Sequence, residues 1–115
     1  MAYLLGIDIS TTSAKALGIN ETGEVVGVHG TPQSVSQPQP LWSEQNPAAW
    51  GEGGATSIRG VRSETGLTGD DITGIGMTGQ MHGLVMLDAE GEGLRPSILW
   101  NDQRTGAQCA AMTEK

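Results

Sequence analysis

The sequence predicts a single α/β domain built on a mixed β-sheet. Three short apolar runs between residues 3 and 30 are separated by tight turns, and a stretch with helical spacing follows at 47–65. Further apolar runs lie between residues 72 and 100, and a second helical stretch follows them. The predicted order is β-β-β-α-β-β-β-α, and a length of 115 residues allows one domain at most.

The first thirty residues predict a three-strand meander. Residues 3–9 are apolar apart from Asp8, and residues 10–13 form a polar turn. The chain becomes apolar again at 14–19, turns at 20–23 and continues as a strand at 24–29. Because the connections are short, neighbouring strands must pair antiparallel.

The next segment predicts a loop and then a helix. Residues 31–45 contain three prolines and no apolar period, which is typical of an extended loop. Asn46 and Pro47 have the residue types of a helix N-cap and first helical position. The helix at 47–65 should present Trp50, Ile58, Val61 and Arg62 near one face. Glycines at 51, 53, 54 and 60 oppose a helix, and the sequence offers no role for the first three.

The rest of the chain predicts further strands and a second helix. Residues 66–71 should form a loop, and 72–78, 84–87 and 96–100 should form strands. A turn is expected at 88–93, and a helix should begin at 105 and run to the end of the chain.

Composition excludes several classes of function. Thirteen acidic and six basic residues give a net charge of −7, and the cations are scattered, so we expect no nucleic-acid partner. The single cysteine, Cys109, cannot form an internal disulfide. No apolar stretch is long enough to span a membrane, and the N-terminus does not fit a signal peptide, so we expect a cytoplasmic protein.

The first candidate site is the turn between the first two predicted strands. Asp8 stands at a strand end, the hydroxyl residues Thr11, Thr12 and Ser13 follow, and Lys15 comes next. Hydroxyls and amides in such a turn can surround a phosphate, and a strand-end carboxylate can hold hydrated Mg²⁺. The alternative is an ordinary hairpin turn, in which serine and threonine are common.

Two further candidate sites lie downstream. Gln80, Met81 and His82 stand between Gly79 and Gly83, where they can contact a hydroxylated ligand or serve as turn and core residues. Trp100 opens a stretch with amide, carboxylate and guanidinium groups, which suits a sugar site. The alternative there is a core tryptophan before a helix capped by Asn101 or Asp102.

One apparent nucleotide motif is excluded by its context. Residues 74–79 read GxGxxG, but they lie within a predicted strand and no helix follows them directly. No P-loop motif is present.

Taken together and in order, these motifs resemble the xylulokinases, a group of the FGGY-type carbohydrate kinases. The resemblance rests on Gly-Ile-Asp at 6–8 with Thr-Thr-Ser at 11–13, on Leu-Trp-Ser-Glu-Gln-Asn-Pro at 41–47, on Gly-Gln-Met-His-Gly at 79–83, and on Leu-Trp-Asn-Asp-Gln-Arg-Thr at 99–105. It extends from about residue 3 to 109 and is loose at 51–70. Ser10 stands where many members of the family carry glycine, a replacement that requires a negative φ.

The resemblance implies a ribonuclease H-like fold of the actin/hexokinase ATPase type, incomplete at its C-terminal side. Residues 1–115 would be the N-terminal part of the first actin-like domain, with the phosphate-1 hairpin and meander at 1–30 and the sugar-site strands and loops at 72–105. The implied reaction is the ATP- and Mg²⁺-dependent phosphorylation of D-xylulose to D-xylulose 5-phosphate. A homodimer of the full-length enzyme stays open.

The resemblance also implies a role for each candidate residue. Asp8 would support activity through the metal and phosphate, while Thr11, Thr12, Ser13 and Lys15 would approach the ATP phosphates. Met81 and His82, with Gln80, would contact the sugar, and Trp100 would line its cleft. The family's later catalytic aspartate has no counterpart in this sequence, so we expect no kinase activity from the isolated chain.

Three alternatives stay open. The parent protein can be a kinase for another sugar or polyol, such as gluconate, ribulose or glycerol, although Met81 and His82 disfavour glycerol, whose kinases carry an Arg-Glu pair there. The chain can instead be a non-catalytic module that binds sugar or phosphate. It can also be a purely structural fragment.

Overall fold

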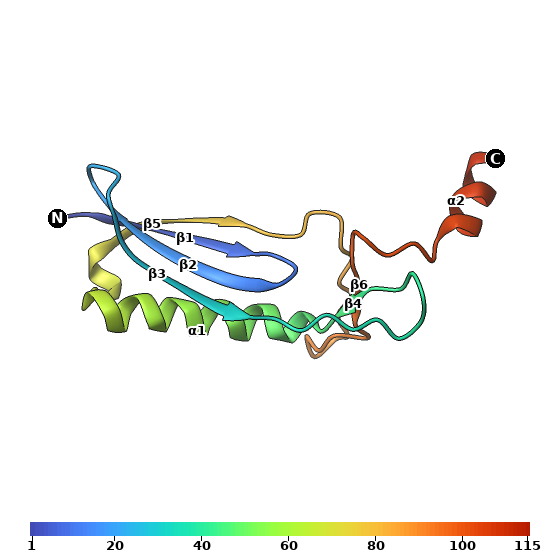
Figure 1. Cartoon of the computed structure of the whole chain (residues 1–115), viewed down its shortest axis with the longest axis horizontal. Helices are drawn as coiled ribbons and strands as arrows, with labels where there is room; N and C mark the ends of the chain where they lie inside the picture. Colours follow the sequence, from blue (N-terminus) through green and yellow to red (C-terminus); the bar gives the residue numbers. More distant parts are fainter. The chain divides into compact units, whose positions relative to one another are not determined.

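The computed structural model describes all residues from 1 to 115 and divides them into two compact units. The first, here called the sheet unit, comprises Met1–Gln33 and Ala48–Gln80. The second, here called the ribbon unit, comprises Ser34–Pro47 and Met81–Lys115. Each unit is described by itself below (Figure 1).

The sheet unit contains a four-stranded mixed sheet in the order β3-β2-β1-β5 (Figure 1). Its strands are β1 (Tyr3–Ile9), β2 (Ser13–Asn20), β3 (Val25–Pro32) and β5 (Ile72–Thr78). The first three form the predicted antiparallel meander, and β5 adds to β1 in parallel. The strand β1 is therefore central in the sheet. Near its C-terminal end, Asp8 has β2 on one side and β5 on the other.

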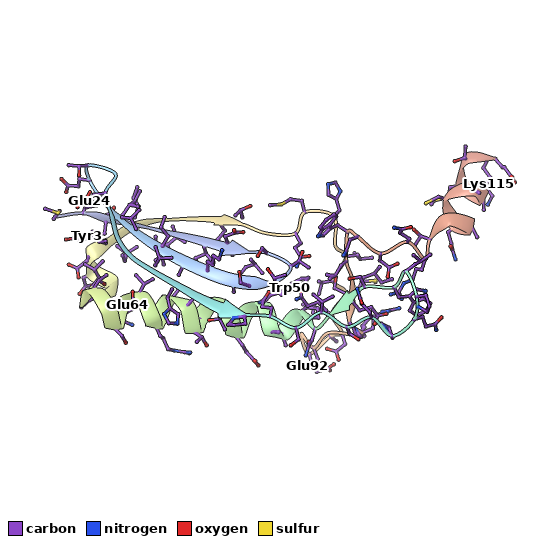
Figure 2. The ribbon with its side chains drawn as sticks, in the orientation of Figure 1. Tyr3, Glu24, Trp50, Glu64, Glu92 and Lys115 are labelled. Atoms are coloured by element: carbon purple, nitrogen blue, oxygen red, sulfur yellow. The ribbon has the colours of Figure 1, made fainter.

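Helix α1 (Pro47–Thr65) covers one face of this sheet. Side chains alternate between the two faces of β1, so Leu5, Ile7 and Ile9 are buried on one face. These three residues pack in one cluster with Val61 of α1. Trp50 lies against the same core, as Figure 2 shows on the sheet side of the helix. The helix bounds agree with the predicted 47–65, and Pro47 is its first residue as expected.

The helix glycines have a packing role that the sequence did not reveal. A Cβ on Gly60 would overlap the imidazole ring of His29, and one on Gly53 would lie 3.1 Å from the side chains of Ala14 and Gln33. A Cβ on Gly54 would be in ordinary contact with Ile9, whereas Gly51 faces open space. Small residues therefore let α1 approach the sheet closely at Gly53 and Gly60.

A short connection returns the chain from α1 to the sheet. Gly66 has a φ of 73°, and its amide donates to the Arg62 carbonyl at 2.8 Å, which ends the helix with a left-handed cap. A single 3₁₀ turn, η1 (Gly69–Asp71), follows, and the Asp71 carboxylate accepts from the Thr68 amide and hydroxyl. These bonds lower the pKa of Asp71, because they favour its ionised form.

The ribbon unit has less regular structure than predicted. Strand β4 (Glu44–Gln45) pairs antiparallel with β6 (Ser97–Ile98), although residues 31–45 were expected to form a loop throughout. The predicted strand at 96–100 is thus reduced to two residues. Pro96 has no amide hydrogen to donate to the ladder, so pairing begins after it.

The predicted strand at 84–87 is wrong. The chain there forms one arm of a short hairpin whose strand pairing is a single bridge between Leu87 and Gly93. Asp88 closes the turn, since its side chain accepts from the amides of Glu90 and Glu92. The two arms share few backbone hydrogen bonds, from the Asp88 amide to the Glu92 carbonyl and from the Leu94 amide to the Met86 carbonyl, so the pairing does not extend into a strand.

Helix α2 (Gly106–Thr113) confirms the predicted C-terminal helix, and all of its residues are exposed. Its N-cap is Thr105, so neither Asn101 nor Asp102 caps it. Neither helix of the structure has the length and apolar character needed to cross a bilayer.

Candidate functional site

Asp8 lies on the face of the sheet opposite α1, at the end of the central strand. The register places it beside Lys15 of β2 and Thr78 of β5. Asp8 and Lys15 are both exposed, and no ion pair joins them. The carboxylate and the ammonium group therefore both remain accessible to a ligand at this edge.

The turn after β1 is closed by hydroxyl groups. The Ser10 amide and its Oγ each donate to the Ser13 carbonyl at 2.9 Å. Ser10 does not have a positive φ, so serine is accommodated where the related kinases often carry glycine. The Thr12 carbonyl accepts from the Gln33 amide at 2.9 Å, which ties the turn to the end of β3.

The same turn contacts the residue that follows β5 and Gly79. The Thr11 hydroxyl donates to Gln80 Oε1 at 3.3 Å, and both residues are partly buried. This contact brings together two of the motifs that the sequence analysis identified separately. It exists because the parallel pairing of β1 with β5 places the ends of both strands at one edge of the sheet.

His82 and Trp100 line one cavity of the ribbon unit, with a volume of about 590 Å³. Its other walls are mainly apolar and include Leu84 and Met86, and Asp102 also belongs to the lining, although its side chain is almost fully buried. Trp100 is 63 % exposed, so it is not the core residue that one alternative required. An apolar surface with an imidazole fits a ligand with both C–H and hydroxyl groups.

The two remaining sugar-site candidates, Met81 and Gln80, do not line this cavity. Met81 is 71 % exposed and does not line the cavity. Gln80 belongs to the sheet unit, where it contacts Thr11 as described. The structure therefore groups the predicted residues into a phosphate-turn cluster of Asp8, Thr11, Thr12, Ser13, Lys15 and Gln80 and a cavity pair of His82 and Trp100.

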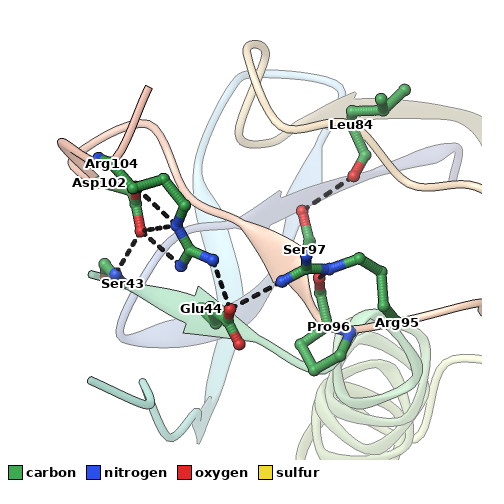
Figure 3. A network of polar contacts seen from close by, with 8 residues as sticks. All are labelled: Ser43, Glu44, Leu84, Arg95, Pro96, Ser97, Asp102 and Arg104. Carbon is green, nitrogen blue, oxygen red and sulfur yellow. Dashed lines mark hydrogen bonds and ion pairs between the residues drawn. The ribbon is translucent and has the colours of Figure 1, made fainter. Parts of the chain in front are cut away.

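A network of ionic contacts in the ribbon unit was not anticipated (Figure 3). Glu44 Oε1 accepts from Arg95 Nη2 at 2.7 Å and from Arg104 Nη1 at 2.8 Å. Arg104 also holds the Asp102 carboxylate through Nε and Nη2, and Asp102 Oδ2 accepts from the Ser43 amide at 2.7 Å. The network links β4 to the chain on both sides of β6.

The environment of this network fixes its charges. The hydrogen bonds from Arg104 hold the pKa of Asp102 far below its usual range, and those to Asp102 and Glu44 raise the pKa of Arg104. The Asp102 side chain is 1 % exposed, so its charge needs this compensation. The Arg104 guanidinium also lies 3.6 Å from the centre of the Trp42 ring, a cation–π contact.

One sequence signal for this network was available. Glu44 is the lone charged residue of the run at 41–47, and two of the six cations of the chain, Arg95 and Arg104, flank the strand that pairs with it. What the sequence lacked was the pairing of β4 with β6, which joins residues more than fifty positions apart.

The titratable side chains form no ready-made metal cluster. No group of three or more His, Cys, Asp or Glu side chains is placed to hold an ion. Asp8, as a single accessible carboxylate beside hydroxyl groups, fits the way Mg²⁺ is bound through one or two carboxylates, waters and substrate phosphates. The residues are thus compatible with a magnesium ion that arrives with a nucleotide.

Comparison with known proteins decides the family. Residues 3–115 match the model for the FGGY family of carbohydrate kinases, N-terminal domain. The chain belongs to this family. The prediction of an α/β fold of the ribonuclease H-like, actin/hexokinase ATPase type is confirmed, because solved FGGY kinases superimpose on the structure.

Several relatives in the FGGY family are named xylulose kinase. Those from Klebsiella pneumoniae and Bacillus subtilis are 41 % and 40 % identical, over 96 % and 100 % of this chain. Among solved structures, a protein described as a xyloylose kinase from Brucella ovis gives a TM-score of 0.89 at 44 % identity over 96 % of this chain. Xylulose kinase from Rhodospirillum rubrum gives 0.90 at 32 % over 97 %.

The chain spans about a quarter of the length of these FGGY relatives, 23 % in each of these four comparisons. A gluconate kinase from Lactobacillus acidophilus, 23 % identical, has the same fold with a TM-score of 0.87, covering 98 % of this chain and 22 % of its own. The fold is therefore shared by proteins whose names give different substrates, and it does not by itself select one.

Proposed function

We propose that this chain is the phosphate-turn and sugar-cavity portion of an enzyme that transfers the γ-phosphoryl group of ATP to D-xylulose. The observation that carries the proposal is the 40–41 % identity of nearly the whole chain to proteins named xylulose kinase. The accessible phosphate-turn cluster and the cavity with His82 and Trp100 support it.

In this proposal the phosphate turn binds the nucleotide. Thr11, Thr12 and Ser13 offer hydroxyls to phosphate oxygens, and Lys15 adds a positive charge. Asp8 holds Mg²⁺ through water, and the ion would supply charge neutralisation to the phosphates when bound. Phosphoryl transfer depends chiefly on positioning and charge stabilisation, so side chains with no covalent role are sufficient here.

The sugar contacts are assigned to four residues, two of which are the cavity pair of His82 and Trp100. His82 hydrogen-bonds a hydroxyl of D-xylulose, Met81 packs against its carbon chain, and Trp100 presents a ring face to its C–H groups. Gln80 is assigned to the sugar as well, and its contact with Thr11 places it next to the phosphate turn. The base that deprotonates the sugar hydroxyl is assigned to no residue of this chain.

Calorimetric titration of the chain with D-xylulose and with Mg–ATP tests these assignments. We expect both to bind, Asp8→Asn to weaken Mg–ATP, and His82→Ala to weaken D-xylulose. Asp70→Asn and His29→Ala are matched controls in the sheet unit, outside both groups of residues, and should change neither affinity. An assay of ADP release with D-xylulose should show no turnover above background.

Another substrate and a purely structural role each give a different result. Tighter binding of gluconate, ribulose or glycerol than of D-xylulose would reassign the substrate. Binding of neither ligand would indicate a purely structural fragment. Turnover by the isolated chain would show that a general base is present after all.

A further inference from the structure

Alternate residues of the segment 100–103 line two different cavities of the ribbon unit. Trp100 and Asp102 line the cavity that also contains His82. Asn101 and Gln103 line a second cavity of about 550 Å³, which the loop at 37–43 completes. The motif at 99–105 therefore serves two sites, and the second is used by none of the roles described above.

The polar groups of the second cavity are neutral. Four of its lining residues carry carboxamides, namely Gln37, Gln39, Asn101 and Gln103. No lining residue is charged. Each carboxamide both donates and accepts hydrogen bonds, which is also what each hydroxyl of a sugar does. A charged ligand would find no counter-ion among these side chains.

The apolar groups of the cavity are flat rings and an aliphatic side chain. Trp42, Pro38, Pro40 and Leu41 line it with the carboxamides. Trp42 is half-buried, and the Arg104 guanidinium stacked on its ring holds it in place. Ring surfaces beside carboxamides suit a ligand that has C–H faces edged by hydroxyls.

The loop that forms one wall is held in a strained conformation. Leu41 has a φ of 67°, in the left-handed region that a leucine rarely adopts. Its carbonyl accepts from the Gln103 amide at 2.9 Å, and the Trp42 amide donates to the Gln39 carbonyl at 3.1 Å. Such strain persists where surrounding contacts maintain it, and it is common at binding sites.

A buried hydroxyl adds a further unsatisfied group to this wall. Ser43 lines the same cavity, is 3 % exposed, and its Oγ forms no hydrogen bond. Buried polar atoms are normally paired, so one without a partner requires an explanation. The Oγ atom has almost no accessible surface, so it lies behind the wall and is not itself a contact for a ligand in the cavity.

We propose that this cavity is a second binding site, for a neutral carbohydrate. It is distinct from the cavity of His82 and Trp100, and it does not rest on the proposed kinase function. The carboxamides select uncharged hydroxylated ligands, and the Trp42 and proline rings bind their apolar faces. With so few atoms in contact, the dissociation constant should be on the order of millimolar.

Nuclear magnetic resonance on the isotopically labelled full chain tests this site. The probes are D-xylose and xylobiose, with D-xylonate and D-xylulose 5-phosphate as anionic counterparts. Side-chain amide signals of Gln39, Asn101 and Gln103 and the indole signal of Trp42 report on the second cavity, and the Trp100 indole reports on the first. The variants are Gln39→Leu/Gln103→Leu and, as the control in the other cavity, Trp100→Ala.

We expect a neutral sugar to shift the second-cavity signals saturably. The double variant should weaken this binding by about tenfold, because two hydrogen bonds are lost, and Trp100→Ala should leave it unchanged. No saturable shift at about 50 mM sugar, equal binding by the double variant, or tighter binding of the anionic probes would overturn the proposal. Should the double variant unfold, magnetisation transfer between the Trp42 ring and the bound sugar in the unaltered chain decides the same question.

Discussion

The Thr11 hydroxyl donates a hydrogen bond to Gln80 Oε1 at 3.3 Å, although 69 positions separate the two residues. This contact joins the turn after β1 to the residue that precedes Met81 and His82. The conformation of the turn at residues 10–13 is therefore tied to the position of Gln80 within the sheet unit.

A double-mutant cycle on this pair should reveal their coupling. Thr11→Val and Gln80→Leu should together destabilise the chain by less than the sum of their separate effects, with a coupling of about 0.5–1 kcal/mol. Urea unfolding measures each free energy. Thr12→Val, at the exposed neighbouring position, is the control and should show no coupling to Gln80→Leu. If Thr12→Val were coupled to Gln80→Leu as strongly as Thr11→Val is, the coupling would not come from the Thr11–Gln80 hydrogen bond.

The helix glycines give opposite predictions at two positions. Gly60→Ala should destabilise the chain by about 1–3 kcal/mol, because its methyl group would collide with the His29 ring packed against α1. Gly51→Ala should instead stabilise it by about 0.5–1 kcal/mol, since Gly51 faces open space and alanine favours a helix. Thermal unfolding monitored by circular dichroism compares the two, and stabilisation by both substitutions would contradict the packing described here.

The two arginines that contact Glu44 should differ in importance. Arg104→Met leaves the buried Asp102 carboxylate without its main partner and removes the group stacked on Trp42, so it should destabilise the chain strongly. Arg95→Met is the matched control, because the Arg95 side chain is 55 % exposed and contacts Glu44 alone among the acids. Denaturant midpoints rank the variants. The indole signal of Trp42 in nuclear magnetic resonance spectra should change with Arg104→Met and stay constant with Arg95→Met.

Acid should weaken the ribbon unit through Asp102. The pKa of Asp102 is lowered in the folded chain by Arg104, so the unfolded chain takes up the proton first as pH falls. The stabilisation is therefore complete above about pH 5 and decreases as pH falls below the ordinary carboxyl pKa toward the lowered one. Unfolding free energies measured from pH 6 to 2.5 should fall less steeply in Asp102→Asn than in the unaltered chain. Parallel curves would show that other carboxyls cause the acid sensitivity.

Sequence patterns predicted the sheet unit well because its order is local. The meander, the helix at 47–65 and the strand at 72–78 follow from apolar period, turn residues and the Asn46-Pro47 start, which act over a few positions. The ribbon unit was predicted poorly. The strand expected at 84–87 is not formed, and β4 was missed, because two-residue strands exist only through partners distant in sequence.

The candidate site divides in the same way. The sequence by itself predicted candidate site residues from Asp8 to Trp100, and through their motifs it indicated the FGGY family to which the chain belongs. Tertiary structure decided which of them meet: Gln80 with Thr11, and His82 with Trp100. It also assigned Gly53 and Gly60 to close packing and placed Glu44, Asp102 and Arg104 in one network. Residue types and their spacing can be read directly from the sequence. Contacts between distant segments depend on strand pairing and burial, which exist only in the folded chain.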